Sequence, residues 1–291
     1  MKYEKFKEIL NNKIFENSKS DLIKKIADNP DRYIGLFRPT KPKGKILQNL
    51  LQSNEIKFGD SLEYLFREYF NEVGYTNLDR MLYIDGTTRE YLDLDQLFTD
   101  GKYVYFIEQK VRDDHDSTKK RGQIENFEKK IIALLKTYKE TKIKSYNYFI
   151  DPSLIKNKNF YISEIEKIKH DYNIYSKLCY GDEFWIDINH KNIWNEILHY
   201  LQMWKEEIPD MPSINFDENA YNTFQEIKNI STITYRKLFE NKDVCKEILP
   251  ILFPHNETLR LLLDFFKSLS IEQSIYRNLA EKISMYLYNK Y

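Results

Sequence analysis

The sequence predicts an α/β domain over residues 1–208 and a mostly helical module over residues 209–291. Two observations lead to this division. Between residues 81 and 111 the helical spacing of apolar residues gives way to runs of β-forming residues, and helical spacing then returns. Beyond Pro209 and Pro212, which mark the best candidate linker, only helical patterns follow.

Composition narrows the class of protein. The 291 residues carry 45 Lys and Arg against 45 Asp and Glu, and 42% of them are apolar, which fits a folded chain with a substantial core. No apolar run is long enough for a membrane span, and the charges in the first ten residues do not fit a signal peptide. Two cysteines, Cys179 and Cys245, cannot form a disulfide framework. We therefore expect a cytoplasmic protein with no membrane partner.

The N-terminal 30 residues predict short amphipathic helices. One of them runs from Asp21 to Asp28, with Ser20 as its cap. Asn29-Pro30 ends it, because the residue before a proline avoids helical backbone angles.

A second helix is expected between Asp60, as its cap, and Gly74, because apolar residues recur at helical spacing between them. Ahead of it, residues 32–50 contain five basic residues and no acidic residue. Prolines and glycines make the middle of that segment a loop. We call residues 38–45 the basic loop.

Strands and helices then alternate along the chain. Runs of β-branched and aromatic residues indicate strands, and single apolar stripes indicate helices. The expected strands are 81–84, 91–98, 103–111, 146–150 and 174–180, and the expected helices begin at Thr118 and cover about 190–206 and 217–228.

Asp100-Gly101 is a strong hairpin signal between two of these strands. A two-residue turn at this position would pair Asp93 with Glu108. Because opposed residues share a face of the sheet, Asp93, Glu108 and Lys110 would then point the same way. A bulge would shift the pairing and bring Asp95 forward instead.

Two carboxylates that face each other across a ladder repel unless a cation lies between them. Oxygen ligands of this kind suit Mg²⁺, and a lysine two residues beyond the second acid can position a water. These groups are suited to metal-assisted hydrolysis of a phosphodiester. The alternative is a solvated hairpin face with ordinary salt bridges, because acid-x-Lys triplets occur seven times in the chain.

With Asp93 followed by Glu108-Gln109-Lys110, the sequence resembles the PD-(D/E)xK nuclease superfamily, and type II restriction endonucleases in particular. The order helix, three strands, helix, strand over residues 58–150 is similar to that family's core, although Leu92 stands in place of the family's proline. The resemblance implies a restriction-endonuclease-like fold, a mixed β-sheet flanked by helices. It also implies Asp93 and Glu108 as Mg²⁺ ligands with the Gln109 carbonyl, and Lys110 as the residue that orients the attacking water.

Glu63 is a further candidate catalytic residue. Many members of the superfamily carry an acid on the helix before the hairpin, and the resemblance implies that Glu63 reaches the metal through water. The alternative is a capping box with Asp60, which stands at the right spacing. Against capping, Glu63 shares a stripe with Phe66 and Phe70, where a free carboxylate is costly.

Basic residues predict the contacts to DNA. Lys119, Lys120 and Arg121 crowd the first turn of a helix, where they oppose the helix dipole, and a phosphate would offset that cost. The alternative is a solvated charge run. The expected DNA-binding residues are this cluster with Arg112 and Gln123, and Arg38, Lys41, Lys43 and Lys45 of the basic loop.

The C-terminal module offers two weaker signals. Ser231 can cap a helix that presents basic residues to DNA. The segment from Leu259 to Leu269 is apolar on nearly every side, which predicts a helix in the core or, alternatively, at a dimer interface.

The predicted function is Mg²⁺-dependent, sequence-specific cleavage of double-stranded DNA at a short, palindromic site by a type II restriction endonuclease. The resemblance implies a homodimer, and a restriction enzyme requires a partner DNA methyltransferase. One alternative is a structure-selective repair or recombination nuclease of the same superfamily. Another is a non-catalytic DNA-binding protein whose acids and lysine form only surface salt bridges.

Overall fold

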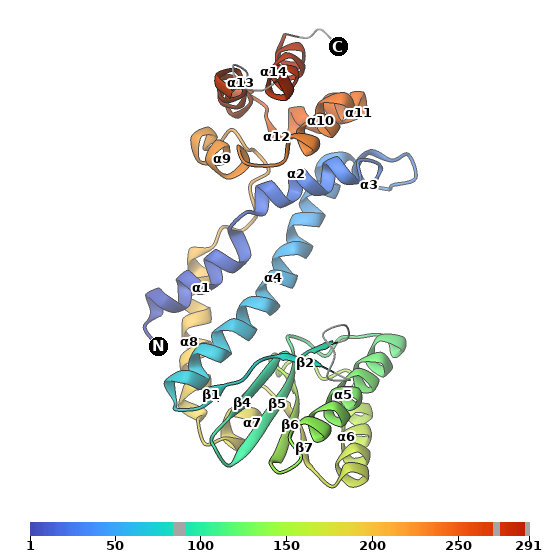
Figure 1. Ribbon diagram of the computed structural model, residues 1–291, viewed down its shortest axis with the longest axis vertical. Coiled ribbons are helices and arrows are strands. Elements are labelled where there is room, and N and C mark those ends of the chain that lie inside the picture. Colours follow the sequence, from blue (N-terminus) through green and yellow to red (C-terminus); the bar gives the residue numbers. More distant parts are fainter. Residues whose placement is uncertain (84–90, 270–273, 289–291) are drawn as a thin grey trace. The chain divides into compact units, whose positions relative to one another are not determined.

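The computed structural model describes residues 1–83, 91–269 and 274–288, and the chain separates into two compact units. The first unit contains residues 1–13 and 58–208, and the second contains residues 14–57 and 209–291. The long helix α4 (Pro42–Glu72) contributes to both (Figure 1).

The chain divides after residue 208, and residues 14–57 belong to the second unit. Their apolar side chains, from Leu22 to Leu50, pack in one core with the C-terminal helices. Sequence neighbours were assigned together in the prediction, whereas burial of apolar surface decides which segments form a unit.

A mixed five-stranded sheet forms the centre of the first unit, in the order β1-β4-β5-β6-β7 (Figure 1). β4 runs antiparallel to β5, whereas β5, β6 and β7 are parallel. Parallel neighbours need crossover helices, which α5 (Ser117–Thr137) and α6 (Lys158–Tyr172) supply. The strands are β1 (Thr76–Asn77), β4 (Gln96–Thr99), β5 (Tyr103–Lys110), β6 (Lys142–Phe149) and β7 (Tyr175–Tyr180).

Helices cover both faces of this sheet, which confirms the predicted mixed sheet flanked by helices. One face packs against α5 and α6, and the other packs against α4 and the short helix α7 (Asp182–Asp187). Aromatic ring pairs define the two faces: Phe106 with Phe127 and Phe149 with Tyr161 on the first, and Phe98 with Phe70 and Tyr148 with Phe184 on the second.

A separate two-stranded sheet pairs β2 (Met81–Tyr83) with β3 (Tyr91–Asp93). The expected strand 91–98 is therefore two strands, β3 and β4, interrupted at Leu94 and Asp95. The expected strand 81–84 extends to residue 84, which lies outside the described residues.

The second unit is a helical assembly around its own core. Leu259, Leu262, Leu263 and Phe266 of α13 (Glu257–Leu269) are buried in that core, which confirms the core interpretation of this segment. No helix within the described ranges is long and apolar enough to span a bilayer.

The remaining helices within the described residues are α1 (Tyr3–Phe15), α2 (Ser18–Asp28), α3 (Asp31–Ile34), α8 (Lys191–Glu207), α9 (Ala220–Ile227), α10 (Thr232–Glu240), α11 (Lys242–Glu247), α12 (Leu249–Leu252) and α14 (Ser274–Leu287).

Several helix boundaries differ from the predicted ones. α4 begins at Pro42 rather than at Asp60, because a proline fits the first turn of a helix and Ile46 and Leu50 bury the added turns. Ser20 lies inside α2 rather than capping it, although α2 ends at Asp28 as predicted. Ser231 caps α10 and accepts a hydrogen bond from the Thr234 amide, as predicted. The helix α6 was not predicted from the sequence.

Asp113, just beyond β5, joins three elements of the first unit. The residue is fully buried. Its Oδ2 accepts hydrogen bonds from the Asn157 amide at 2.8 Å and the Tyr180 hydroxyl at 2.9 Å, and its Oδ1 accepts one from Asn157 Nδ2 at 2.8 Å. Asp113 thereby fixes the end of β5 against β7 and the loop before α6.

We expect Asp113→Ala to lower the free energy of unfolding by about 2–4 kcal/mol, because three buried donors lose their acceptor. Urea denaturation followed by circular dichroism measures this change. The matched control is Asp114→Ala, whose side chain is 51% exposed and which should unfold as the wild type does. Equal midpoints for the two variants would contradict the structural role assigned to Asp113.

Candidate active site

The connection between β4 and β5 determines which acid faces Glu108. Thr99 pairs with Val104, so residues 100–103 form a four-residue loop instead of the predicted two-residue turn. The Asp100 carboxylate holds this loop, because its Oδ1 accepts hydrogen bonds from the amides of Lys102 and Tyr103 at 2.8 and 2.7 Å.

The predicted pairing of Asp93 with Glu108 is therefore wrong by two residues. A shift of two keeps every side chain on its face of the sheet. Continued beyond Gln96, the observed register places Asp95 opposite Glu108. Asp93 instead pairs with Met81 in the two-stranded sheet, and its residue is exposed. The predicted alternative, in which a shifted pairing places Asp95 instead of Asp93 opposite Glu108, thus describes the structure.

Asp95 and Glu108 converge on the ammonium group of Lys110. Lys110 Nζ lies 2.7 Å from Asp95 Oδ2, 3.0 Å from Glu108 Oε1 and 2.9 Å from the Gln109 carbonyl oxygen. The Gln109 amide also donates to Asp95 Oδ2 at 2.7 Å, so the Asp95 carboxylate binds the backbone of β5 directly. Three oxygens of the predicted motif therefore surround one cation.

A second lysine completes this cluster from α5. Lys130 Nζ lies 2.6 Å from Glu108 Oε2 and 4.0 Å from Asp95 Oδ1. The side chains of Lys130 and Glu108 are each only 5% exposed, so this is a buried ion pair. Two carboxylates and two ammonium groups balance each other in charge, which a largely dry site requires.

The charges around Lys110 govern its protonation. Burial lowers the pKa of Lys110, but the nearby carboxylates of Glu108 and Asp95 outweigh burial and raise it above its ordinary value. Lys110 is therefore a fixed positive charge at neutral pH and acts as a hydrogen-bond donor rather than as a base.

Glu63 lies inside α4 and faces the same region. The capping-box alternative is excluded, because α4 starts 21 residues before Glu63. Glu63 Oε2 accepts from Arg80 Nη1 at 3.0 Å, and the same Arg80 atom donates to the Asp95 carbonyl at 3.2 Å. Burial and the Asp95 charge nevertheless raise the pKa of Glu63 to about 7, against the opposing effects of Lys110 and Arg80.

Gln96 and Gln109 join Glu63 to the sheet. Gln96 Nε2 donates to the Glu63 carbonyl at 2.8 Å and to Gln109 Oε1 at 3.2 Å. Both glutamines are buried. This network lies on the opposite face of β5 from Glu108, so α4 and α5 approach the end of the strand from its two sides.

A cleft of about 770 Å³ opens beside these residues. It is more polar than apolar and receives side chains from α1, α4 and the two-stranded sheet. Asp93 lines the cleft, although it does not contact Lys110. The lining residues are Lys13, Asp60, Glu63, Tyr64, Arg67, Leu78, Asp79, Arg80, Met81, Tyr91, Asp93 and Asp95.

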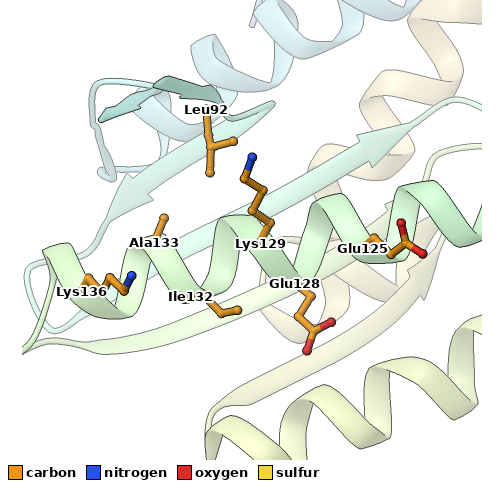
Figure 2. Close-up of a pocket in the computed structure, with 7 residues that line it drawn as sticks. All are labelled: Leu92, Glu125, Glu128, Lys129, Ile132, Ala133 and Lys136. Atoms are coloured by element: carbon orange, nitrogen blue, oxygen red, sulfur yellow. The ribbon is translucent and has the colours of Figure 1, made fainter. Parts of the chain in front are cut away.

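A smaller hollow of about 270 Å³ lies over α5 between Leu92 and Lys129 (Figure 2). Figure 2 shows Ile132 and Ala133 of α5 among its lining residues, with Glu125, Glu128 and Lys136 around them. None of the clustered acids and lysines described above lines it. Lys129, the neighbour of Lys130 in sequence, is exposed on this surface and is a suitable control position.

The residues predicted to bind DNA occupy three places. Lys119, Lys120, Arg121 and Gln123 lie in the first two turns of α5, which Asp116 caps through the amides of Thr118 and Lys119. Within that group, Lys120 lies over the Phe160 ring and Gln123 accepts from the Tyr161 hydroxyl. Arg112 follows β5. The residues Arg38, Lys41, Lys43 and Lys45 belong to the second unit. The predicted basic loop is wrong in its second half, because α4 begins at Pro42 and contains Lys43 and Lys45.

The donor set at Lys110 fits a hard divalent cation. Asp95, Glu108 and the Gln109 carbonyl supply oxygens alone, which is the ligand type that Mg²⁺ prefers. Within residues 1–83, 91–269 and 274–288, no group of three or more His, Cys, Asp or Glu side chains is arranged to hold a metal. The site thus has two protein carboxylates, the number that Mg²⁺ sites commonly use beside water and substrate phosphate.

Lys130 and Arg80, which contact the clustered acids, were not predicted from the sequence. A signal for Lys130 was present, because it stands three residues after Phe127 and four before Leu134, on the apolar stripe of α5. A charged residue on a buried stripe needs a partner. No comparable signal marked Arg80, which precedes a short strand.

Comparison with protein families matches residues 2–81 and 75–205 to the family described as type II restriction endonuclease, HinfI. The two overlapping segments cover more than half of the chain and include all of the clustered acids and lysines. Comparison with curated proteins and with solved structures gives no match.

We expect Glu63→Gln to stabilise the metal-free protein more at high pH than at low pH. Glu63 binds its proton up to about pH 7 in the folded state, against about 4.5 in the unfolded chain, so the wild type loses stability as pH rises between these values. The increase in the free energy of unfolding that the substitution gives should grow by about 2–3 kcal/mol over this pH range. Thermal unfolding in EDTA at pH 5 and pH 8.5 measures it.

The control is Glu8→Gln, which removes an exposed carboxylate of α1 that does not line the cleft and should not reproduce this gain. If the difference between Glu63→Gln and the wild type does not change with pH, Glu63 is ionised throughout and the interpretation of its surroundings is wrong.

Proposed function

The chain belongs to the HinfI family of type II restriction endonucleases and is a sequence-specific DNA endonuclease; we propose that it cuts double-stranded DNA at a short palindromic site with Mg²⁺ as cofactor. The observation that carries the proposal is the convergence of Asp95, Glu108 and the Gln109 carbonyl on one cation position. Asp95 replaces Asp93 as the proposed first ligand.

Each residue of the cluster has a distinct proposed role. Asp95 and Glu108, with the Gln109 carbonyl, would hold Mg²⁺. When bound, the metal makes a water more acidic and stabilises charge on the phosphate. Lys110 donates a hydrogen bond that orients the attacking water, and its raised pKa keeps it cationic beside the phosphate. Glu63 lines the cleft, and we propose that it holds water there.

The products follow from this chemistry. Attack of the water oxygen on phosphorus forms one P–O bond and breaks the bond to the 3′ oxygen of the sugar. The cleaved strand then carries a 5′-phosphate and a 3′-hydroxyl. The developing negative charge lies beside Lys110, whose side chain is 29% exposed and is the most exposed among Asp95, Glu108, Lys110 and Lys130.

We propose that the enzyme acts as a homodimer. One chain contributes one Asp95–Glu108–Lys110 set within its described residues, whereas cutting both strands of a palindrome requires two sets related by two-fold symmetry. A partner methyltransferase would protect the same site in the host. The basic residues at the start of α5 and in the basic loop are proposed to hold the DNA backbone.

Plasmid DNA provides the central test. With Mg²⁺, the wild type should give discrete fragments, while Asp95→Ala and Lys110→Ala should cut at least about 100-fold more slowly because each loses part of the charged centre. Asp93→Ala should keep most of its activity, since the exposed Asp93 carboxylate does not contact Lys110. Gel electrophoresis with sequencing of the fragment ends measures both the rate and the site.

Other outcomes are informative. Loss of cutting in Asp93→Ala but not in Asp95→Ala would overturn the assignment of Asp95 while leaving the function intact. A ladder without fixed ends, or cutting of branched DNA alone, would favour a structure-selective nuclease. Binding without any cutting would overturn the proposed activity.

Lys130 is a proposed positioning residue that acts through Glu108. It binds Oε2 of Glu108, which leaves Oε1 directed toward Lys110. It also places a buried positive charge close to the cation position. Lys130 should therefore orient Glu108 and at the same time weaken the attraction of the site for a divalent cation.

We expect Lys130→Met to bind Ca²⁺ several-fold more tightly than the wild type yet to cut DNA more slowly at saturating Mg²⁺. Loss of one partner from a buried pair should also lower stability by about 3 kcal/mol without metal, and Ca²⁺ should restore more of it than in the wild type. Calorimetry measures binding and thermal unfolding measures stability.

Lys130→Arg, which keeps the charge, should restore part of the cutting rate, and Lys129→Met on the exposed surface of α5 should resemble the wild type (Figure 2). If Lys130 only stabilised the fold, Lys130→Met would bind Ca²⁺ more weakly than the wild type and would also cut DNA more slowly. That combination would overturn the positioning role.

A further inference from the structure

Leu36 and Phe37 are the most exposed large apolar side chains in the described part of the chain. Their exposed fractions are 90% and 98%, and the next highest is 70% for Tyr288. Both lie at the tip of the loop that joins α3 to α4, within the second unit. Two adjacent apolar side chains held fully in water indicate that another molecule covers them.

The loop is held in place at both ends. Tyr33 before it and Ile46 after it are fully buried in the core of the second unit. Gly35 donates to the Asp31 carbonyl at 3.0 Å, and a Cβ at position 35 would lie 2.5 Å from that oxygen, so only glycine allows this exit from α3. Pro39 further restricts the backbone beyond the tip.

The surroundings of the tip are strongly basic. Residues 32–54 contain five positive charges, those of Arg32, Arg38, Lys41, Lys43 and Lys45, and no negative charge. Arg38, Lys41 and Lys43 are exposed, and among the described residues none of the three forms an ion pair. An apolar tip with cations beside it thus faces solvent.

The positive charge of residues 32–54 indicates which kind of molecule covers Leu36 and Phe37. Two copies of the loop packed tip to tip would bring ten positive charges together, five from each copy, which opposes self-association. DNA satisfies both parts of the surface, because its phosphates pair with the cations and its stacked bases accept apolar side chains. Proteins that bend DNA commonly insert Phe or Leu between base pairs from the minor groove.

We infer that Leu36 and Phe37 form a wedge that enters the base stack of the bound duplex while Arg38, Lys41 and Lys43 bind the flanking phosphates. The inference rests on the proposed cleavage of double-stranded DNA. The wedge unstacks one base step, and such unstacking is easiest at flexible pyrimidine–purine steps. The loop therefore contributes to sequence preference without hydrogen bonds to base edges.

The test uses the full-length protein and a duplex of about 30 base pairs that carries the site mapped from plasmid fragments, in Ca²⁺ without Mg²⁺. The fluorescent base 2-aminopurine, placed at successive positions, reports unstacking. The wild type should raise the fluorescence several-fold at one step. Phe37→Ala should abolish that rise and weaken binding roughly 10-fold, and Phe37→Leu should restore part of both.

Salt dependence separates the apolar tip from its cations. Phe37→Ala should weaken binding without changing the slope of log K against log salt, whereas Lys41→Ala should reduce the slope by about 1 for the lost phosphate contact. Ile56→Ala is the matched control, because Ile56 is 62% exposed on α4 and lies outside the loop. Its binding and fluorescence should equal those of the wild type.

Three results would overturn the inference. The first is wild-type protein that cuts DNA at fixed sites but raises the fluorescence at no step, which rejects the wedge alone. The second is a Phe37→Ala variant that sediments as a smaller species and binds DNA with unchanged unstacking, which makes the loop an interface between copies. The third is wild-type protein that cuts no DNA, which rejects the proposed function together with the wedge.

Discussion

The structure depends on the need to neutralise two carboxylates held side by side. The side chains of Asp95 and Glu108 are 15% and 5% exposed, and both carboxylates lie within 3.0 Å of Lys110 Nζ. In so poorly hydrated a site, their mutual repulsion would be large without a cation. Lys110 and Lys130 neutralise them from two directions, one from the end of β5 and one from α5. The sheet and the helix α5 that covers it bring these four charges together.

Interruption of one strand makes the cluster possible. Between β3 and β4 the chain leaves the ladder at Leu94 and Asp95, and the Asp95 carboxylate accepts the Gln109 amide in place of a backbone carbonyl. The site is thus built into a break in the sheet, where a side chain can replace the backbone of a neighbouring strand. Asp113, just beyond β5, fixes the end of the same strand through buried hydrogen bonds.

The sequence predicted the alternation of helices and strands and the strand that carries Glu108 and Lys110, because these depend on local periodicity. The mixed sheet was predicted from the resemblance to the nuclease superfamily. The sequence did not predict the hairpin register, because the side chain of Asp100 holds a four-residue loop where Asp-Gly favours two residues. A two-residue shift leaves each side chain on the same face of the sheet. A carboxylate therefore still lies opposite Glu108, but it belongs to Asp95 instead of Asp93. Lys130 and residues 14–57 have partners distant in sequence, which periodicity does not reveal.

Zero net charge now has a structural explanation. Three acids of the site are paired within the protein, since Asp95 and Glu108 are balanced by two lysines and Glu63 contacts Arg80. Residues 32–54 carry five positive charges and no negative charge. Attraction to a phosphate backbone depends on local fields and not on the total. A balanced chain can therefore bind DNA strongly where its cations are unpaired and release it readily elsewhere, which a site-specific nuclease requires.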